Sequence, residues 1–257
     1  MLKKRIRHFL FAFAAVFSYN RDQHILYHTK KEQPMIQAVV FDMDGVLFDT
    51  ERLYNEAWHE VAESWPIQAD LDDLIVRCVG LNHTDTRRLF DDMLGEDFPF
   101  DAYTGRIGAR FHEMVEEELP VKEGVPEILR WLKEQKIPTA LATSTSREGA
   151  LSHLQRTGIL SYFDEMITGD MVEHSKPAPD IYLIACDALH VPPSNCIAVE
   201  DSPNGIRSAY AAGMMAVMIP DQIAPTDELR AMLYREFPSL TDLLRYLKEQ
   251  QSLGNIR

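Results

Sequence analysis

The sequence predicts an α/β fold in which an all-helical segment interrupts a parallel sheet after its first strand. Three observations support this prediction. QAVVF at 37–41 is a short, β-branched apolar run with the composition of a buried strand. Residues 51–119 have a helical pattern and contain no convincing strand. From Val121 onward helices and strands alternate, and such alternation produces right-handed crossovers and a parallel sheet covered on both faces.

The expected elements follow one another in order. The segment 51–119 is expected to be helical, with breaks near Trp65-Pro66, Gly80-Leu81-Asn82 and Phe98-Pro99. After it, each helix precedes a strand: helix 124–135 and strand 138–143, helix 147–156 and strand 165–168, helix 178–189 and strand 196–199, helix 203–212 and strand 215–219. Helix 239–249 closes the chain. We therefore expect an N-terminal extension at 1–34, an α/β core from 35–49 and 120–257, and a helical cap at 50–119.

The first 34 residues differ in charge from the rest of the chain. They carry a net charge of +5, whereas the remaining residues carry −19. A basic start and an apolar run at 9–17 have the outline of a signal peptide, but the run is far shorter than the ~20 apolar residues that a spanning helix needs. Three interpretations compete: a weak export signal, a membrane-surface anchor, or translated upstream sequence with the natural start at Met35. We favour the third, because a predicted buried strand begins at Ile36.

Composition excludes several classes of protein. The chain is 46% hydrophobic and 26% charged, which is globular rather than collagen-like or disordered. A net charge of −14 argues against nucleic-acid binding. The three cysteines, Cys78, Cys186 and Cys196, are odd in number and form no CxxC pair, which argues against a disulfide framework or a structural zinc site. We expect a cytoplasmic monomer without a stable membrane span.

Polar clusters follow the predicted strands, at the edge where parallel sheets bind their ligands. They are Asp42-Met43-Asp44-Gly45, Thr143-Ser144-Thr145-Ser146, Lys176 and Glu200-Asp201-Ser202. The aspartates of the first cluster, with Glu200 and Asp201, would bring up to four carboxylates together. Unpaired carboxylates repel one another, and a hard divalent cation relieves the repulsion. The residues therefore predict a Mg²⁺ site, because Mg²⁺ prefers a few carboxylates, waters and a phosphate.

The same clusters are suited to a phosphoryl group. Lys176 supplies positive charge, while the hydroxyls of Thr143 and Ser144 and the amides at the start of helix 147–156 can bind phosphate oxygens. A carboxylate held in such a site can act as a nucleophile and form an aspartyl-phosphate. A second carboxylate two residues further on can serve as the acid for the leaving oxygen and then as a base.

These motifs resemble those of a known family. DMDGVLFDTE, LATS, the lysine of SKPAPDIY and VEDSPNG are similar, in combination and in order, to the four motifs of the haloacid dehalogenase-like (HAD) superfamily. The resemblance covers about residues 36–250, and it is strongest to the subgroup with a helical cap between the first two motifs, which includes β-phosphoglucomutases and small sugar- or nucleotide-phosphate phosphatases. ERLYNEAW at 51–58 and the LATSTSRE segment also look similar to pseudouridine 5′-phosphatases. The resemblance implies a Rossmann-like core with a mobile helical cap.

The resemblance also implies a role for each matching residue. Asp42 would be the nucleophile and a Mg²⁺ ligand, and Asp44 the general acid/base that binds the metal through its backbone carbonyl. Thr143 and Ser144 would bind the phosphoryl group, and Lys176 would bridge it to Asp42. The remaining metal ligands would be Asp201 and Glu200, the latter either directly or through water.

Several positions keep more than one interpretation. Thr143 fits both phosphate binding and the N-terminal turn of a helix. His83 could contact substrate or be an exposed loop histidine, and Arg147 could contact a substrate phosphate or lie on the helix surface. The segment between Thr50 and Pro120 carries 17 acids and six bases, so it would repel highly charged substrates, which favours a monophosphate.

The resemblance helps to choose among reactions. Dehalogenases of the superfamily lack the second aspartate, so Asp44 argues against that chemistry. β-Phosphoglucomutases typically carry a histidine and an arginine where this chain has Tyr54 and His83. Hydrolysis is therefore our prediction: a Mg²⁺-dependent phosphatase acting on a small sugar or nucleotide monophosphate through an aspartyl-phosphate. A phosphosugar mutase is the alternative, and a non-catalytic phosphometabolite-binding protein is the lesser one.

Overall fold

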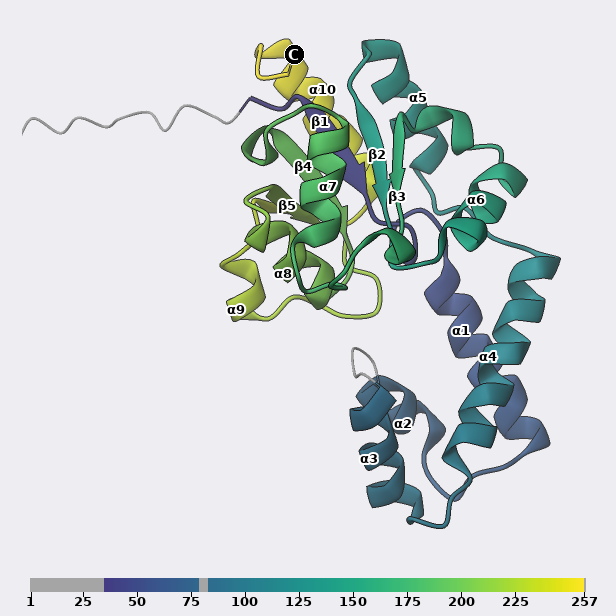
Figure 1. Ribbon diagram of the computed structural model, residues 1–257. Coiled ribbons are helices and arrows are strands. Elements are labelled where there is room, and N and C mark those ends of the chain that lie inside the picture. Colours follow the sequence, from purple (N-terminus) through teal and green to yellow (C-terminus); the bar gives the residue numbers. More distant parts are fainter. Residues whose placement is uncertain (1–34, 79–82, 257) are drawn as a thin grey trace, which may run out of the picture. The chain divides into compact units, whose positions relative to one another are not determined.

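The computed structural model describes residues 35–78 and 83–256, which form an α/β fold (Figure 1). In this part of the chain, six strands build one parallel sheet in the order β3-β2-β1-β4-β5-β6. The strands are β1 (Ala38–Phe41), β2 (Thr139–Ala142), β3 (Glu165–Ile167), β4 (Cys196–Glu200), β5 (Met215–Met218) and β6 (Arg235–Glu236). The predicted fold class is confirmed. The analysis missed β6, because its two exposed charged residues carry no apolar pattern.

Helices cover both faces of the sheet, and the period-two alternation of β1 explains how. Ala38 and Val40 belong to the apolar cluster that includes α7, α8 and α9, whereas Val39 and Phe41 belong to the cluster with α5, α6 and α10. Both faces of β1 are completely buried, as expected for a strand in a parallel sheet. The core helices are α5 (Val125–Gln135), α6 (Arg147–Arg156), α7 (Asp180–Ala188), α8 (Pro203–Ala211), α9 (Asp227–Arg230) and α10 (Leu240–Ser252).

The segment between the first two strands of the sequence is helical, as expected. It contains α1 (Thr50–Ser64), α2 (Leu71–Cys78), α3 (His83–Leu94) and α4 (Phe100–Glu117), and we call it the helical insert. Aromatic residues fill its interior. The rings of Phe90 and Phe100 lie 4.9 Å apart in an edge-to-face arrangement, and Trp58 and Tyr103 pack against the same group. Buried aromatic pairs of this kind contribute stability beyond the area they bury.

The chain passes between the core and the helical insert twice, and the two passages are hydrogen-bonded to each other. The Asp49 amide donates to the Pro120 carbonyl at 3.0 Å, and the Lys122 amide donates to the Leu47 carbonyl at 2.9 Å. Phe48 and Val121 form an antiparallel bridge between these bonds. The insert therefore begins and ends beside the loop that follows β1.

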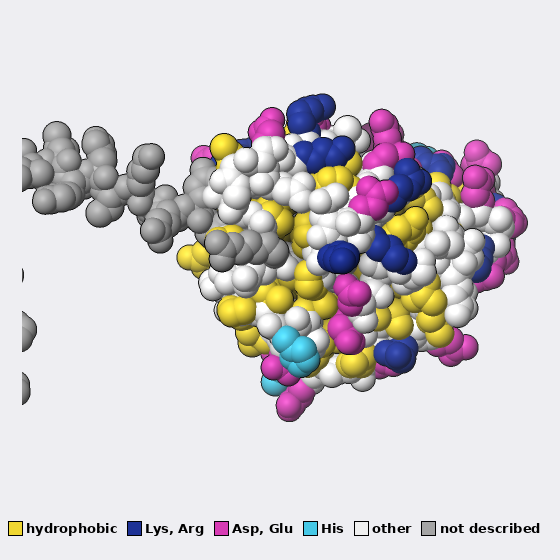
Figure 2. Space-filling model, turned by 90° about the horizontal axis from the view of Figure 1, so that it is seen from above, with side chains coloured by type: hydrophobic (Ala, Val, Ile, Leu, Met, Phe, Trp, Pro, Cys, Tyr) yellow, Lys and Arg dark blue, Asp and Glu magenta, His cyan; other side chains and the backbone are white. Residues whose placement is uncertain are grey.

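Some expectations fall on residues that the structure does not describe. These are the prediction that 1–34 is an extension and the predicted helix break at 80–82. Among the described residues, no helix is both long and apolar enough to cross a membrane. On the face shown in Figure 2, acidic, basic and apolar side chains are interspersed, as is usual for a protein surface.

Candidate active site

Three strands end together and carry the candidate residues to one edge of the sheet. Phe41, the last residue of β1, lies opposite Leu141 of β2 and Val199 of β4. The residues that follow these positions therefore meet at the carboxyl ends of the strands. The Asp42 amide donates to the Val199 carbonyl at 3.0 Å, which fixes the start of the loop after β1.

Lys176 connects all three of these strand ends. Its ammonium donates to Asp42 Oδ1 at 2.6 Å, to Glu200 Oε1 at 2.7 Å and to the Ala142 carbonyl at 3.0 Å. The side chains of Lys176 and Asp42 are about nine-tenths buried, and that of Glu200 is completely buried. Burial lowers the pKa of the Lys176 ammonium, but the two carboxylates outweigh it and raise this pKa above its usual value. Lys176 is therefore a permanent cation within the site.

Glu200 is held by several donors besides Lys176. The Tyr182 hydroxyl, from α7, donates to Glu200 Oε1 at 2.5 Å, and the Ser202 hydroxyl donates to Oε2 at 3.2 Å. Close packing by α8 also requires Gly205, because a Cβ there would lie about 2.0 Å from the Glu200 carboxylate oxygens. The sequence analysis missed Tyr182. The sequence feature that could have indicated Tyr182 is its position in SKPAPDIY, six residues after Lys176.

Asp42, Glu200 and Asp201 form an acidic cluster in which one carboxylate oxygen of each residue lies within 4.8 Å of the others. Burial is the largest cause that raises the pKa of Asp42 to about 7. Lys176 opposes this rise, and Glu200 and Asp44 add to it. Burial, Glu200 and Asp42 likewise raise the pKa of Asp201 well above its usual value. One lysine therefore does not compensate these carboxylates, and their oxygens are the donor set that a hard divalent cation prefers.

The turn after β1 brings Asp44 close to the same cluster. Gly45 follows it with φ +73, and a Cβ at this glycine would lie 2.1 Å from Asp201 Oδ2, so both the backbone and the close approach require glycine. Thr145 donates from its hydroxyl to Asp44 Oδ2 at 2.9 Å. The sequence analysis missed Thr145 as a partner of Asp44, although it lies in the Thr-Ser-Thr-Ser run that the analysis singled out.

The two hydroxyl residues expected to bind phosphate differ in their surroundings. Thr143 is buried directly after β2, and its hydroxyl accepts a hydrogen bond from the Thr145 amide at 3.1 Å. Ser144 is exposed. Ser146 caps α6 by accepting from the Gly149 amide. The loop after β2 therefore brings Thr145 to the Asp44 carboxylate, and Thr143 and Ser144 directly precede Thr145 in this loop.

Of the two residues expected to contact substrate from further away, only Arg147 has a described side chain, and no observed contact brings it to this cluster. The Arg147 guanidinium lies 3.8 Å from Met171 Sδ, and its backbone amide donates to Asp170. His83 begins α3, but its side chain lies outside the described residues. The substrate roles of both therefore stay predictions.

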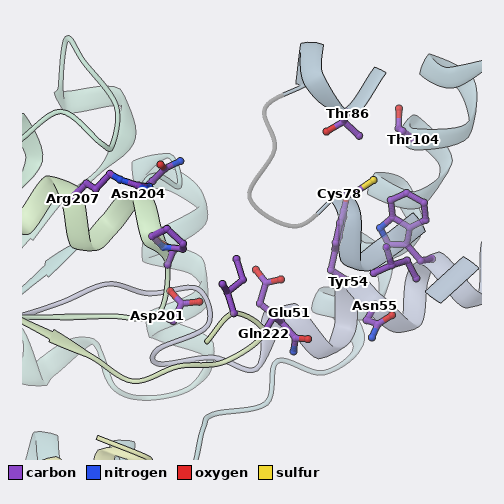
Figure 3. Close-up of a pocket in the computed structure, with 15 residues that line it drawn as sticks. Glu51, Tyr54, Asn55, Cys78, Thr86, Thr104, Asp201, Asn204, Arg207 and Gln222 are labelled. Atoms are coloured by element: carbon purple, nitrogen blue, oxygen red, sulfur yellow. The ribbon is translucent and has the colours of Figure 1, made fainter. Parts of the chain in front are cut away.

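A pocket of about 650 Å³ opens beside the acidic cluster, between the helical insert and the core (Figure 3). Asp201 belongs both to the cluster and to the lining of this pocket. The insert contributes polar and aromatic side chains, and the core contributes the start of α8 with the residues before it, and the loop at 222–223. The residues shown with labels are Glu51, Tyr54, Asn55, Cys78, Thr86, Thr104, Asp201, Asn204, Arg207 and Gln222. The site is therefore an acidic, lysine-bridged cluster at the foot of a mixed polar and aromatic pocket.

Comparison with known proteins agrees with this geometry. The family model of haloacid dehalogenase-like hydrolases matches residues 39–219, which include every residue of the acidic cluster. The chain belongs to this family. All four motifs that the sequence analysis singled out in this HAD-like hydrolase lie within the matched residues.

Individual relatives of this HAD-like enzyme are phosphatases. A "Phosphorylated carbohydrates phosphatase" from Thermotoga maritima is 37% identical over 70% of this chain and 82% of its own length. A Drosophila melanogaster protein, named as a probable pseudouridine-5′-phosphatase, is 34% identical over 71% of this chain and 80% of its own. A solved structure from Thermotoga maritima, described as a candidate β-phosphoglucomutase, is 34% identical, with a TM-score of 0.69, and the match covers 83% of this chain and 99% of that one.

Proposed function

We propose that this HAD-like hydrolase is a Mg²⁺-dependent phosphatase that hydrolyses a small phosphomonoester through an aspartyl-phosphate on Asp42. The observation that carries the proposal is the convergence of Asp42, Lys176 and Asp201 at one edge of the sheet. Sugar phosphates are the substrates we favour, since the relatives include a phosphatase of phosphorylated carbohydrates and a fructose-1-phosphate phosphatase. The family match supports phosphoryl chemistry in general, and the geometry supports these particular roles.

Asp42 is the proposed nucleophile. Its Oδ1 accepts from Lys176, which orients the carboxylate and leaves Oδ2 for attack on phosphorus. The bond from phosphorus to the leaving alcohol oxygen breaks as the Asp42–phosphorus bond forms. Water then attacks the aspartyl-phosphate, which releases inorganic phosphate and restores the Asp42 carboxylate.

Asp44 is the proposed general acid and base. Its carboxyl group lies on the turn two residues after the nucleophile, and the Thr145 hydroxyl fixes its Oδ2. In the first step Asp44 gives a proton to the leaving oxygen, and in the second step it takes a proton from the attacking water. A residue that performs both steps must stay within reach of the phosphorus throughout, which the short Asp42-Met43-Asp44 connection ensures.

In the proposed site, Lys176 and a metal ion together compensate the negative charge of the carboxylates and the phosphoryl group. Lys176, the Thr143 hydroxyl and the amides of the loop before α6 are proposed to bind the phosphoryl oxygens, with Ser144 beside them. Asp42, Asp201 and the Asp44 carbonyl would hold Mg²⁺, with Glu200 acting directly or through water. The bound cation supplies electrostatic stabilisation of the charge that develops on the phosphoryl oxygens. Residues 50–119 are proposed to act as a cap over this site, with 35–49 and 120–257 as the core.

The experiment is phosphate release from a panel of small phosphomonoesters, with and without Mg²⁺, by the full chain and by its Asp42→Asn variant. We expect Mg²⁺-dependent release by the wild type, and a loss in kcat on the order of 10³-fold or more in the variant. Asp187→Asn, on an exposed position of α7, is the matched control and should retain full activity. Substantial residual turnover by a clean Asp42→Asn preparation would refute the nucleophile assignment.

The reaction product distinguishes a phosphosugar mutase from a phosphatase. β-Glucose 1-phosphate supplied together with a bisphosphate primer gives glucose 6-phosphate with a mutase and inorganic phosphate with a phosphatase. We expect inorganic phosphate. Binding of phosphomonoesters without hydrolysis of any of them would instead favour the non-catalytic alternative.

A further inference from the structure

Two of the three cysteines form a pair in the core that the proposed mechanism does not use. Cys186 lies in the last turn of α7, and Cys196 is the first residue of β4. Both are free cysteines, and both side chains are buried in the same apolar cluster. Their thiols act on each other as hydrogen-bonding partners. The pair therefore joins a helix and a strand through two reducing groups in contact.

The connection between α7 and β4 holds the thiols in this position. The Val191 amide donates to the Cys186 carbonyl at 3.1 Å, so the chain turns back directly after the helix. The Cys196 thiol lies against the same turn, at 3.4 Å from the Pro192 carbonyl oxygen and 3.8 Å from that of Val191. A disulfide joins Cβ atoms about 3.5–4.5 Å apart, so two thiols that already interact need little backbone movement to bond.

The two thiols differ in reactivity and in access. The hydrogen bond with Cys196 lowers the pKa of the Cys186 thiol against the effect of burial, whereas the same bond and burial raise the pKa of Cys196. The thiolate is the form that attacks an oxidant. Cys186 also lines a surface cavity of about 370 Å³, together with His190 and Pro193. A small oxidant that enters this cavity therefore meets Cys186 first, and Cys196 lies behind it as the second thiol.

The pair is connected to the candidate active site through α7. Tyr182 lies one helical turn before Cys186 and is buried on the same face of α7. Its hydroxyl donates at 2.5 Å to Glu200, the last residue of the strand that begins at Cys196. A sulfur–sulfur bond is much shorter than a contact between two thiols, so its formation pulls the end of α7 toward β4. Such a shift disturbs the Tyr182–Glu200 hydrogen bond, whose strength depends on close approach.

We propose that Cys186 and Cys196 form an oxidation site at which a peroxide converts the two thiols into a reversible disulfide that lowers turnover through Tyr182. In the first step the Cys186 sulfur attacks one peroxide oxygen, the O–O bond breaks, one water leaves and a sulfenic acid forms. In the second step the Cys196 sulfur attacks the Cys186 sulfur, the S–O bond breaks, and a second water leaves. Two electrons pass from the thiols to the peroxide.

This site goes beyond the proposed function, on which only its activity readout relies. A dithiol reverses the change by thiol–disulfide exchange. Disulfides of this kind, in compartments that keep thiols reduced, are usually transient and redox-sensing.

The test treats the full chain with a small molar excess of hydrogen peroxide and then with dithiothreitol, and maps non-reduced peptides by mass spectrometry. We expect the free thiols to fall from three to one. The peptides of Cys186 and Cys196 should be joined, with the loss of two hydrogen atoms. Mg²⁺-dependent phosphate release should fall about tenfold, as for a lost hydrogen bond to a charged group. Dithiothreitol should reverse both changes.

Variants test each part of this sequence of events. Cys186→Ser and Cys196→Ser should form no disulfide and keep their untreated rates in peroxide. Cys78→Ser is the matched control, and its rate should fall by the same factor as that of the wild type. Tyr182→Phe still forms the disulfide, but its rate should then change by less than about twofold, because the hydroxyl on which the effect depends is already absent.

Every other outcome overturns the inference. Peroxide treatment that leaves both thiols free, or that oxidises Cys186 without joining it to Cys196, overturns the site, and the wild type alone shows this. A disulfide with unchanged turnover, or an equal loss in Tyr182→Phe, overturns the connection to the active site. Absence of phosphate release from the untreated enzyme overturns the proposed function instead. The rise in melting temperature on adding Mg²⁺ then replaces activity, and an equal rise in reduced and oxidised protein overturns the inference.

Discussion

Lys176 shows at the scale of one residue how the site holds opposite charges together. Its ammonium is nine-tenths buried and is compensated by Asp42 and Glu200 at 2.6 and 2.7 Å. Such a buried group is stable only with its partners, because removing one partner leaves uncompensated charge in a medium of low polarity. The same arrangement orients the Asp42 carboxylate for its proposed attack, so stability and the proposed catalysis both depend on Lys176.

Lys176→Met is therefore expected to destabilise the metal-free protein by about 3 kcal/mol, because two buried carboxylates lose their cation. It should also remove measurable phosphate release. Urea unfolding in the presence of a chelator measures the first effect. Lys248→Met, at an exposed position of α10, is the matched control and should change stability by less than about 0.5 kcal/mol. A Lys176→Met protein as stable as the control would contradict the ion-pair account.

The sequence predicts the acidic residues of the candidate site better than it predicts the side chains that hydrogen-bond to them. Asp42, Glu200 and Asp201 could be predicted, because each lies at or directly after the end of a strand and parallel strands end at one edge. Tyr182 and Thr145 could not, since their hydrogen bonds depend on how α7 and the loop after β2 pack against that edge. Partners of this kind come from tertiary packing, which has no local signature in the sequence.

At the scale of elements, a single side chain joins three segments around the turn that carries Asp44. The Lys122 ammonium donates to the Gly45 carbonyl at 2.9 Å and pairs with Asp221 Oδ1 at the same distance. Lys122 lies where the chain returns from the helical insert, and Asp221 lies in the loop before the pocket residues Gln222 and Ile223. The turn, the return passage and the pocket loop are therefore connected through one ammonium group.

Lys122→Met is expected to lower kcat by about tenfold, because the turn that presents Asp44 loses its contact, and to raise KM as well, because the pocket loop at Asp221 loses the same contact. Lys122→Arg should recover part of the loss, since it preserves the charge. Steady-state kinetics at several pH values provides the measurement. A variant with a lower melting temperature but an unchanged kcat would show that Lys122 is structural only.

The elements themselves could largely be predicted, for a physical reason. Strands such as β1 and β4 are continuous apolar runs because both of their faces are buried, and these runs are easy to detect. By contrast, α9 and β6 are short, largely exposed elements with little apolar pattern, and the analysis did not predict either. Their positions depend on neighbouring segments: β6 exists because its backbone pairs with β5.

The whole molecule carries far more acidic than basic groups, and the candidate site concentrates this imbalance. Asp42, Glu200 and Asp201 share one buried lysine, and the whole chain, with a net charge of −14, has no excess of positive charge to offset them. Ionising the cluster therefore opposes folding of the metal-free protein. The proposed Mg²⁺ would remove this penalty, because a cation that binds the folded cluster and not the unfolded chain stabilises the folded state.

The pH dependence of stability follows from the sign of the Asp42 shift. Its pKa rises from 3.8 to about 7 in the folded protein, chiefly through burial, with Lys176 opposing and Glu200 adding to the rise. The folded state therefore holds this proton more tightly than the unfolded state. The stability it contributes is complete below about pH 4 and is lost as the pH rises through about 7.

Mg²⁺ is consequently expected to raise the melting temperature more at about pH 8 than at about pH 5, because the cation binds the ionised cluster. Thermal unfolding in excess Mg²⁺ and in chelator, across this range, measures the difference. Asp201→Asn removes one proposed ligand and one partly buried charge, so it should stabilise the chelated protein near pH 8 and reduce the gain from Mg²⁺. A gain from Mg²⁺ that is independent of pH, and equal in Asp201→Asn, would mean that the cation acts somewhere other than on these carboxylates.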